Sequence, residues 1–395
     1  MINKLRLLTS VYYYQTLSLF FGLIIRRKKT FENKSVLFLS PFFPENAGYH
    51  WRVQKWDEEL RKAGYTKVDS WCAVDKHSFN EYSNNSSLFM IRFLRKRFKQ
   101  VIKAQKYETV IVCRELLVFN DYGDLFLEKL LRKICNNLIL DIDDDLSASK
   151  NQPKTIDSFF AKLLHENGNS FRESFKYYDK FIVASSYLKE YVIEHVNVDE
   201  SQVCVIPTCV DYNNYESKKY AITNNQPVLG WIGGDHNYYL IDTIIPILNK
   251  LAETFTFKLL VIGGEEYRAD TIFEIENIQW SLKSEVENLN KIDIGLMPLD
   301  DSEMSKGKGG FKLIQYMGLG IVSIATAVTI NEEIVQDKTN SFLIYTSDDW
   351  YTVLSDIFNE KYNLNQIGRN AKYTIHERFT FDSNKQKYLD FICVE

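Results

Sequence analysis

Lysines and glycines alternate in a short stretch of the C-terminal half, Lys306-Gly307-Lys308-Gly309-Gly310, which Phe311 and Lys312 follow at once. Glycines let a backbone approach a phosphate closely, and lysines supply mobile positive charge. These residue types at this spacing are suited to binding a phosphate or diphosphate. The alternative is a surface turn with solvated lysines, because short Gly/Lys patterns also occur without any ligand.

The residues around this stretch predict a strand, a glycine loop, a helix and a second strand. An apolar run at 294–299 precedes the loop, apolar residues recur at helical spacing over 311–317, and another apolar run follows at 321–325. A helix that begins after Gly310 would point its first N–H groups and the positive end of its dipole at a bound anion.

A polar loop follows the first predicted strand of the N-terminal half. The run 35–41 predicts a buried strand, and the loop 44–52 carries His50 and Arg52 just before a helix predicted over 53–63. Ligands in open α/β sheets bind beyond the carboxyl ends of the strands. We therefore expect His50 and Arg52 to contact a sugar or phosphate, with a purely structural role as the alternative.

Aspartates cluster where the strand predicted at 137–141 ends, at Asp141, Asp143, Asp144 and Asp145. Carboxylates in this D-x-D spacing are compatible with a Mg²⁺ site, with contacts to a sugar, or with the N-terminal cap of a helix. The residues alone leave these roles open.

A second glycine turn opens the C-terminal half. The strand that starts at Pro227 ends at Gly233 and Gly234, and a helix is predicted over 239–252. The G-x-G-x-x-G spacing of a dinucleotide fingerprint is absent. The next predicted strand, 258–262, also ends in a glycine-containing polar turn.

The order of these motifs resembles glycosyltransferase family 4, the group 1 glycosyltransferases. The stretches that carry the resemblance are 307–325, Gly230-Trp231-Ile232-Gly233-Gly234, Pro41-Phe42-Phe43-Pro44, Asp141-Ile142-Asp143-Asp144 and Val205-Ile206-Pro207-Thr208-Cys209-Val210-Asp211. The resemblance implies the α/β fold called GT-B, in which two Rossmann-like domains face each other across a cleft and a C-terminal helix packs back on the N-terminal domain. We expect an N-terminal amphipathic or anchor segment (1–34), an acceptor domain (35–212), a polar linker near 213–226, a nucleotide-sugar-binding domain (227–375) and a terminal helix (376–395).

The resemblance also implies roles for individual residues. The expected catalytic residues are Lys308, Lys312 and Asp143, and the expected acceptor-binding residues are His50, Arg52 and Asp144. The expected donor-binding residues are Gly233, Gly234, His236, Glu265, Gly309, Gly310, Phe311, Leu313 and Gln315. The co-substrate would be a nucleotide diphosphate sugar, with no cofactor and no metal, because enzymes of this fold generally do without a D-x-D metal.

The chain departs from the family pattern at two places. The family has a glutamate eight residues ahead of another across the phosphate loop and helix, where this chain has Gly307 and Gln315. Many relatives also carry Arg and Lys soon after the first glycine turn, and neither type occurs between Gly233 and Asn249. Gln315 retains the ability to hydrogen-bond a ribose hydroxyl.

The resemblance favours a retaining hexosyltransferase that acts on a glycan or lipid-linked acceptor in bacterial cell-surface polysaccharide synthesis, such as lipopolysaccharide, capsule or exopolysaccharide. The alternative is a non-catalytic GT-B subunit that binds a nucleotide sugar or supports a partner transferase. A nucleotide-sugar epimerase of the same architecture is less favoured, because no matching set of catalytic carboxylate and histidine is visible.

Composition excludes several other classes of protein. The chain has 395 residues, 45% of them apolar, and a formal net charge of −4, so it is long enough for two domains and carries no overall positive charge for nucleic acid. Its six cysteines are dispersed without a C-x-x-C pair. This pattern predicts reduced thiols in a cytoplasmic protein and no structural zinc site.

Two segments of the N-terminal half indicate contact with a membrane. Residues 7–25 carry no charge and are flanked on both sides by basic residues, which suits either an interfacial anchor or a helix packed on the first domain. A helix over 90–103 would place basic residues on one face and apolar residues on the other. We expect peripheral attachment to the cytoplasmic face of the inner membrane, although the outer helix of a Rossmann domain has the same pattern.

Overall fold

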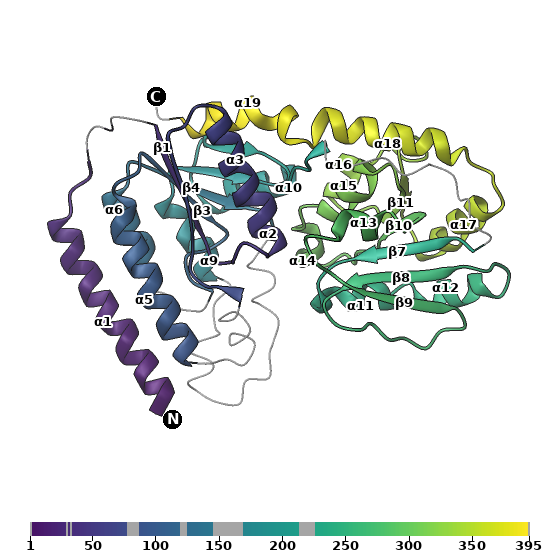
Figure 1. The fold of residues 1–395 in the computed structure, drawn as a ribbon, viewed down its shortest axis with the longest axis horizontal. Coiled ribbons are helices and arrows are strands. Elements are labelled where there is room, and N and C mark those ends of the chain that lie inside the picture. The colour runs from purple at the N-terminus through teal and green to yellow at the C-terminus, as the bar shows by residue number, and fades with distance from the viewer. Residues whose placement is uncertain are drawn as a thin grey trace. The chain divides into compact units, whose positions relative to one another are not determined.

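The computed structural model describes residues 2–28, 31, 34–76, 87–118, 125–144, 169–212 and 226–393 (Figure 1). The chain forms two compact units. The first comprises Met1–Thr208 and Lys385–Glu395, and the second comprises Cys209–Asn384. Most of the expected linker, residues 213–225, lies outside the described residues.

A parallel sheet of six strands forms the centre of the first unit, in the order β2-β1-β3-β4-β5-β6. The strands are β1 (Ser35–Ser40), β2 (Lys67–Cys72), β3 (Thr109–Cys113), β4 (Asn137–Ile142), β5 (Lys180–Val183) and β6 (Val203–Val205). β1, β3 and β4 are buried along their whole length, as expected for parallel strands that are covered on both faces. Asp141 and Asp143 lie at the carboxyl end of β4.

Helices surround this sheet. They include α1 (Ile2–Ile24), α2 (Ala47–Tyr49), α3 (Lys55–Lys62), α5 (Ser87–Ala104), α6 (Phe126–Ile134), α9 (Asn169–Ser174) and α10 (Ser186–His195), with the short helices η1 (His50–Gln54), η2 (Phe175–Tyr177) and η3 (Glu200–Gln202). α1, α5 and α6 pack against one another (Figure 1).

The last helix, α19 (Phe381–Ile392), returns to the first unit, as the resemblance implied. The Tyr388 ring stacks on Trp56 of α3 with a centroid distance of 3.8 Å. Lys385 pairs with Glu59 at 2.8 Å between Nζ and Oε2. These contacts fix the chain's end beside the helix that follows the first polar loop.

The second unit is built on another parallel sheet of six strands, in the order β12-β11-β10-β7-β8-β9. The strands are β7 (Val228–Ile232), β8 (Lys258–Gly263), β9 (Glu274–Gln279), β10 (Ile294–Met297), β11 (Val322–Thr326) and β12 (Phe342–Ile344). The helices are η5 (Asp235–Asn237), α11 (Tyr238–Asp242), α12 (Ile245–Ala252), α13 (Glu285–Leu289), α14 (Glu303–Lys306), α15 (Phe311–Gly318), α16 (Ile330–Ile334), α17 (Ser347–Phe358) and α18 (Leu364–Arg378).

The prediction of a single helix over 239–252 is wrong. The structure has two helices, α11 and α12, with Pro246 in the first turn of the second. Proline has no N–H to donate and its ring collides with the carbonyl four residues earlier, so the helix is interrupted there and begins again at Ile245.

Candidate functional site

The glycine loop of the second unit leads into α15 at Gly310. This residue has a φ of +67°, which L-residues with a side chain rarely adopt. A Cβ at this position would also lie 2.9 Å from side-chain carbons of Ile330 and Ile334. Both the backbone conformation and the packing therefore require glycine where the helix starts, as expected for a loop that presents its backbone to an anion.

A short helix that the sequence did not predict precedes this loop. α14 is capped by Ser302, whose hydroxyl oxygen accepts from the Ser305 N–H at 3.2 Å. Asp300 in turn accepts hydrogen bonds from both serine hydroxyls. The Asp-x-Ser-x-x-Ser pattern of 300–305 is the sequence signal for this capped helix. Its hydrogen bonds hold the residues before the glycine loop in a fixed turn.

The two candidate lysines, Lys308 in the loop and Lys312 in the first turn of α15, reach β7 and the turn that follows it. Lys308 Nζ donates to Asn237 Oδ1 at 3.1 Å. Lys312 Nζ lies 3.8 Å from the centre of the Trp231 ring, where a cation is attracted by the ring's negative face. A Cβ at Gly233 would collide with the Lys312 ammonium group and would lie 2.7 Å from its Cε. Two glycine motifs that are far apart in the sequence thus form one cluster.

The turn after β7 is held by an aspartate that the sequence analysis missed. Asp235 Oδ1 accepts from the backbone N–H groups of Gly264 at 2.7 Å and Glu265 at 3.0 Å. Tyr238 donates its hydroxyl hydrogen to the Glu265 carbonyl at 2.5 Å. Burial and the nearby Asp235 charge raise the pKa of Tyr238 to about 12. These bonds bring the exposed Glu265 to the same edge of the sheet as Gly234.

His236 and Leu313 hold different places in this cluster. The Nε2 atom of His236 lies 3.0 Å from Asn237 Nδ2, and a Cβ at Gly234 would contact the imidazole ring at 2.7 Å. The Leu313 side chain is fully buried in the core, while Phe311 and Lys312 are half-buried. His236 is therefore beside the glycine turn, and Leu313 stabilises α15 from within.

Gln315 lies next to a buried carboxyl that the sequence analysis also missed. Both Gln315 and Glu285 are 3% exposed. Glu285 Oε2 accepts from Trp280 Nε1 at 2.7 Å. Burial raises the pKa of Glu285, and the Trp280 indole and the Gln315 amide act in the opposite direction. Glu285 Oε1 and Gln315 Nε2 are buried and have no partner of good hydrogen-bond geometry among the described residues, so the amide lies beside the carboxyl without a well-formed bond to it.

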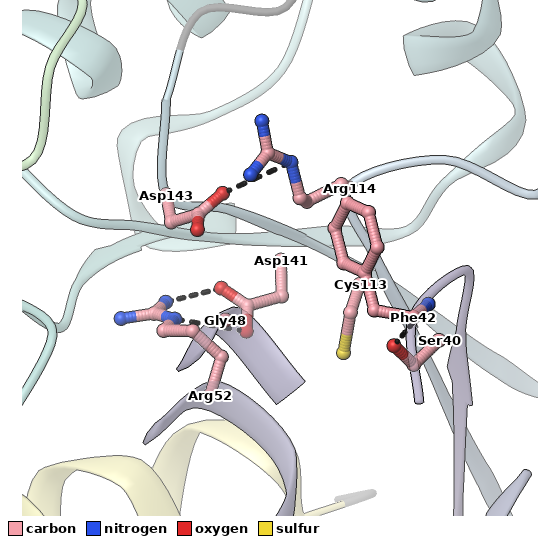
Figure 2. Close-up of a pocket in the computed structure, with 8 residues that line it drawn as sticks. All are labelled: Ser40, Phe42, Gly48, Arg52, Cys113, Arg114, Asp141 and Asp143. Carbon is pink, nitrogen blue, oxygen red and sulfur yellow. Dashed lines mark hydrogen bonds and ion pairs between the residues drawn. The ribbon is translucent and has the colours of Figure 1, made fainter. Parts of the chain in front are cut away.

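In the first unit, Arg52 and Asp141 form a buried ion pair (Figure 2). Arg52 is 3% exposed and Asp141 is 2% exposed. Arg52 also donates from Nη1 to the Ile206 carbonyl at 2.9 Å, which ties η1 to the end of β6. Burial raises the pKa of Asp141, and the Arg52 guanidinium partly offsets this rise. The guanidinium that we expected to meet an acceptor is thus already bound to a carboxylate.

Asp143 faces a different arginine in the same pocket (Figure 2). Arg114 Nε lies 3.4 Å from Asp143 Oδ1, and its guanidinium lies 5.5 Å from the centre of the Phe42 ring. Arg114 has a φ of +65°, a conformation that residues other than glycine rarely adopt. Burial raises the pKa of Asp143, and Arg114 lowers it.

These two pairs line a small pocket with a cavity volume of about 10 Å³, which is room for about one water molecule. Its lining residues are Ser40, Phe42, Gly48, Arg52, Cys113, Arg114, Asp141 and Asp143. His50 and Asp144 are not among them; His50 Nδ1 lies 3.2 Å from Gln54 Oε1. The structure therefore brings together Arg52 and Asp143 of the expected residues, and it adds Arg114.

No group of three His, Cys, Asp or Glu side chains suited to a metal ion occurs among the described residues. Asp145, the last member of the aspartate cluster, lies outside them.

Residues 226–359 match a protein-family model described as "Glycosyl transferases group 1". This stretch, about a third of the chain, is similar to group 1 glycosyltransferases. It contains the whole cluster of the second unit, from Trp231 to Gln315, and the suspected relationship is confirmed at this level. The pocket of the first unit lies outside the matched residues.

Several solved structures share the fold of this chain at low sequence identity. Anabaena Alr3699/HepE in complex with UDP-glucose is 14% identical, with a TM-score of 0.63 over 90% of this chain and 98% of that one. Sucrose-phosphate synthase from Thermosynechococcus elongatus is 13% identical, with a TM-score of 0.64 over 90% and 98%. The lipopolysaccharide outer core galactosyltransferase WaaB, in its apo form, is 13% identical, with a TM-score of 0.60 over 91% and 99%. These similarities confirm the expected α/β class of GT-B type. No curated protein sequence matches the chain significantly.

Proposed function

We propose that this protein transfers a sugar from a nucleotide diphosphate sugar to a hydroxyl group of an acceptor. The observation that supports this most is the cluster in which Lys308 contacts Asn237 and Lys312 lies against Gly233, both in the turn after β7. The cluster combines two ammonium groups with backbone at the start of α15, which is the chemistry that a diphosphate requires. HepE, a structural relative, was solved with UDP-glucose.

Stabilisation of the negative charge on the leaving diphosphate would lower the activation barrier of the reaction. When the bond between sugar and diphosphate breaks, negative charge develops on the diphosphate and positive charge on the sugar. Lys308, Lys312 and the backbone amides of Gly309 and Gly310 would stabilise the negative charge, and because their positions are fixed before the reaction they need no reorganisation. The reaction would retain the anomeric configuration of the sugar and would need no metal ion.

Gln315 would bind the ribose of the donor. Its amide lies beside the buried Glu285 carboxyl. An amide held at this point can take the place of the family's second glutamate, because a carbonyl oxygen also accepts a hydrogen bond from a ribose hydroxyl. In this role, Glu285 would hold the amide in orientation.

Residues that line the pocket of the first unit would contact a hydroxyl group of the acceptor. Arg114 and Asp143 offer a donor and an acceptor of hydrogen bonds at the wall of this pocket, which suits a sugar hydroxyl. Arg52 would act indirectly, by holding Asp141 in place. We further propose that the acceptor is a glycan or a lipid-linked glycan of bacterial cell-surface polysaccharide synthesis, and that the reaction takes place in the cytoplasm. The lipopolysaccharide galactosyltransferase WaaB, which has the same fold, supports this part of the proposal.

A screen of donors tests the proposed function. The purified chain is incubated with UDP-, GDP-, ADP- and TDP-sugars, and thermal stabilisation and the release of nucleoside diphosphate are followed. A donor that stabilises the protein and is slowly hydrolysed is the expected result. Stabilisation without any release, even with glycolipid acceptors present, would favour the alternative of a non-catalytic subunit, and no stabilisation by any donor would contradict both.

A further inference from the structure

Helix α1 has two apolar faces, and only one of them packs on the protein. The inner face contacts α5 and α6. Its buried or partly buried residues are Leu7, Val11, Tyr14, Leu17, Ser18, Phe21 and Ile25, the last just after the helix end. They recur at intervals of three and four, the spacing of one helical face.

The outer face of α1 is apolar and exposed. Its residues, with 55 to 80% of their surface exposed, are Leu5, Tyr12, Tyr13, Leu19, Phe20, Leu23 and Ile24. This helix thus carries seven of the twelve large hydrophobic side chains that are exposed in the described part of the chain. Exposed apolar residues that are scattered singly need no explanation, whereas a continuous face of them indicates an interaction surface.

Packing argues against a helix that crosses a membrane alone. By length and composition, Leu5–Ile24 could span a bilayer. However, Ser18 donates its hydroxyl hydrogen to the Phe126 carbonyl at 3.0 Å, and Arg27 donates from Nε to the Lys133 carbonyl at 3.1 Å. To span the bilayer, α1 would have to leave these contacts and the core that Leu7 and Val11 complete.

The charges beside this face are positive. Arg26, Arg27 and Lys28 follow the helix directly, and neither α1 nor the neighbouring α5 contains an acidic residue. The solvent-exposed side of α5 carries Arg92, Arg95, Lys96, Lys99 and Lys103. The chain as a whole has a net charge of −4, so this concentration of positive charge is local.

The structure changes the role that the sequence suggested for α5. Its apolar residues Phe93, Leu94 and Phe98 are buried in the core, so they are not available to lipid. Among the described residues of these two helices, the exposed large apolar side chains lie on α1 except for Leu88 at the start of α5, so α1 supplies the apolar contact and α5 contributes charge next to it.

We propose that α1 lies in the plane of an anionic lipid bilayer, with its outer face among the acyl chains and the basic residues of α5 and of 26–28 near the lipid phosphates. An apolar helix face beside basic residues is the composition of interfacial helices. Anionic lipid attracts such residues through a surface potential that salt weakens. A second copy of the chain fits less well, because docking of two such faces would bring like charges together. The inference does not depend on the donor chemistry.

Sedimentation with vesicles tests the proposal. The full chain is mixed with vesicles of phosphatidylcholine alone and of phosphatidylcholine with phosphatidylglycerol, at low and high salt. We expect binding to the anionic vesicles that weakens as salt is added. The variant Leu19→Gln/Leu23→Gln should lose at least about tenfold in partitioning, and its melting temperature should stay unchanged. Ile272→Gln, which removes an exposed side chain of the second unit (68% exposed), is the matched control and should bind as the wild type does.

Three results would overturn the proposal. The first is equal sedimentation of the wild type and the Leu19/Leu23 variant. The second is a dimer that this variant dissociates, without vesicle binding by the wild type. The third is resistance of the vesicle-bound wild type to extraction with alkaline carbonate, which would indicate a spanning helix.

Discussion

Lys308 donates a hydrogen bond of 3.1 Å from its Nζ to Asn237 Oδ1, and so links the glycine loop before α15 to the turn after β7. The two residues are 71 positions apart in the chain. This bond holds an ammonium group at the place where we expect the donor's diphosphate.

Substitution of Lys308 should weaken the binding of a diphosphate selectively. In Lys308→Met we expect a loss of roughly 1.5 to 3 kcal/mol in affinity for the nucleoside diphosphate that the wild type prefers, because a hydrogen bond to a charged group is lost. The corresponding nucleoside monophosphate should lose much less. Titration calorimetry with both nucleotides measures this difference, and Lys306→Met is the control, since Lys306 is paired with Asp301 at 3.2 Å. Equal losses for the two nucleotides would mean that Lys308 does not contact the diphosphate.

Gly310 should tolerate no side chain. Gly310→Ala should cost about 2 to 4 kcal/mol in the free energy of unfolding, because alanine is strained at this φ and its Cβ collides with Ile330 and Ile334. The control is Gly64→Ala, which has a φ of +90° but nothing within 4 Å of the added Cβ. It should cost only about 1 kcal/mol. Denaturant unfolding measures both, and similar costs would show that packing at Gly310 is unimportant.

The ion pair of Arg52 and Asp141 should stabilise the first unit only as a pair. Asp141→Asn leaves a buried guanidinium without its carboxylate, and we expect a loss of about 3 to 5 kcal/mol in stability. The double variant Arg52→Met/Asp141→Leu should recover much of that loss. Lys189→Gln removes an ion pair in which Glu200 is 77% exposed and should change the stability by less than about 1 kcal/mol. If the double variant is less stable than Asp141→Asn, the pair is not the source of the effect.

Glu285 should make stability depend on pH. Burial raises its pKa in the folded chain, so the folded chain binds this proton more tightly than the unfolded chain does. Its stabilising contribution is complete below the ordinary pKa of 4.5 and is lost as the pH rises through the raised folded value. Glu285→Gln keeps an acceptor for Trp280 and should remove this part of the pH dependence, with no loss of stability at neutral pH.

Unfolding measured across this pH range tests the role of Glu285. The control is Glu287→Gln, on the same helix but exposed, which should keep the wild-type dependence. If Glu285→Gln and the wild type show the same dependence on pH, the carboxyl is not buried as described.

Much of the fold could be predicted because its signals are local. The glycine loop, the buried strands and the helix after Gly310 follow from residues within a few positions of one another. The break between α11 and α12 could also be predicted, because Pro246 cannot continue a helix. The apolar periodicity over 239–252 hides this signal.

The site was less predictable because its contacts join distant residues. Nothing near Glu285 indicates that Trp280 and Gln315 will bury it, and nothing near Asp235 indicates that its carboxylate will bind the backbone at Gly264. Arg52 lies at the predicted strand end, yet Asp141 from another strand occupies its guanidinium. In each case the sequence indicates the residue type and the fold determines the partner.

Donor turnover by a Lys312→Met variant tests the central claim most directly. Methionine keeps an apolar chain against Trp231, so the loss of the ammonium group is isolated from the loss of packing. We predict that release of nucleoside diphosphate from the preferred donor falls by an amount equivalent to roughly 2 to 4 kcal/mol at the transition state, with the melting temperature unchanged. Lys306→Met should turn over as the wild type does. Near-unchanged turnover by Lys312→Met would contradict the claim that this lysine stabilises the departing diphosphate.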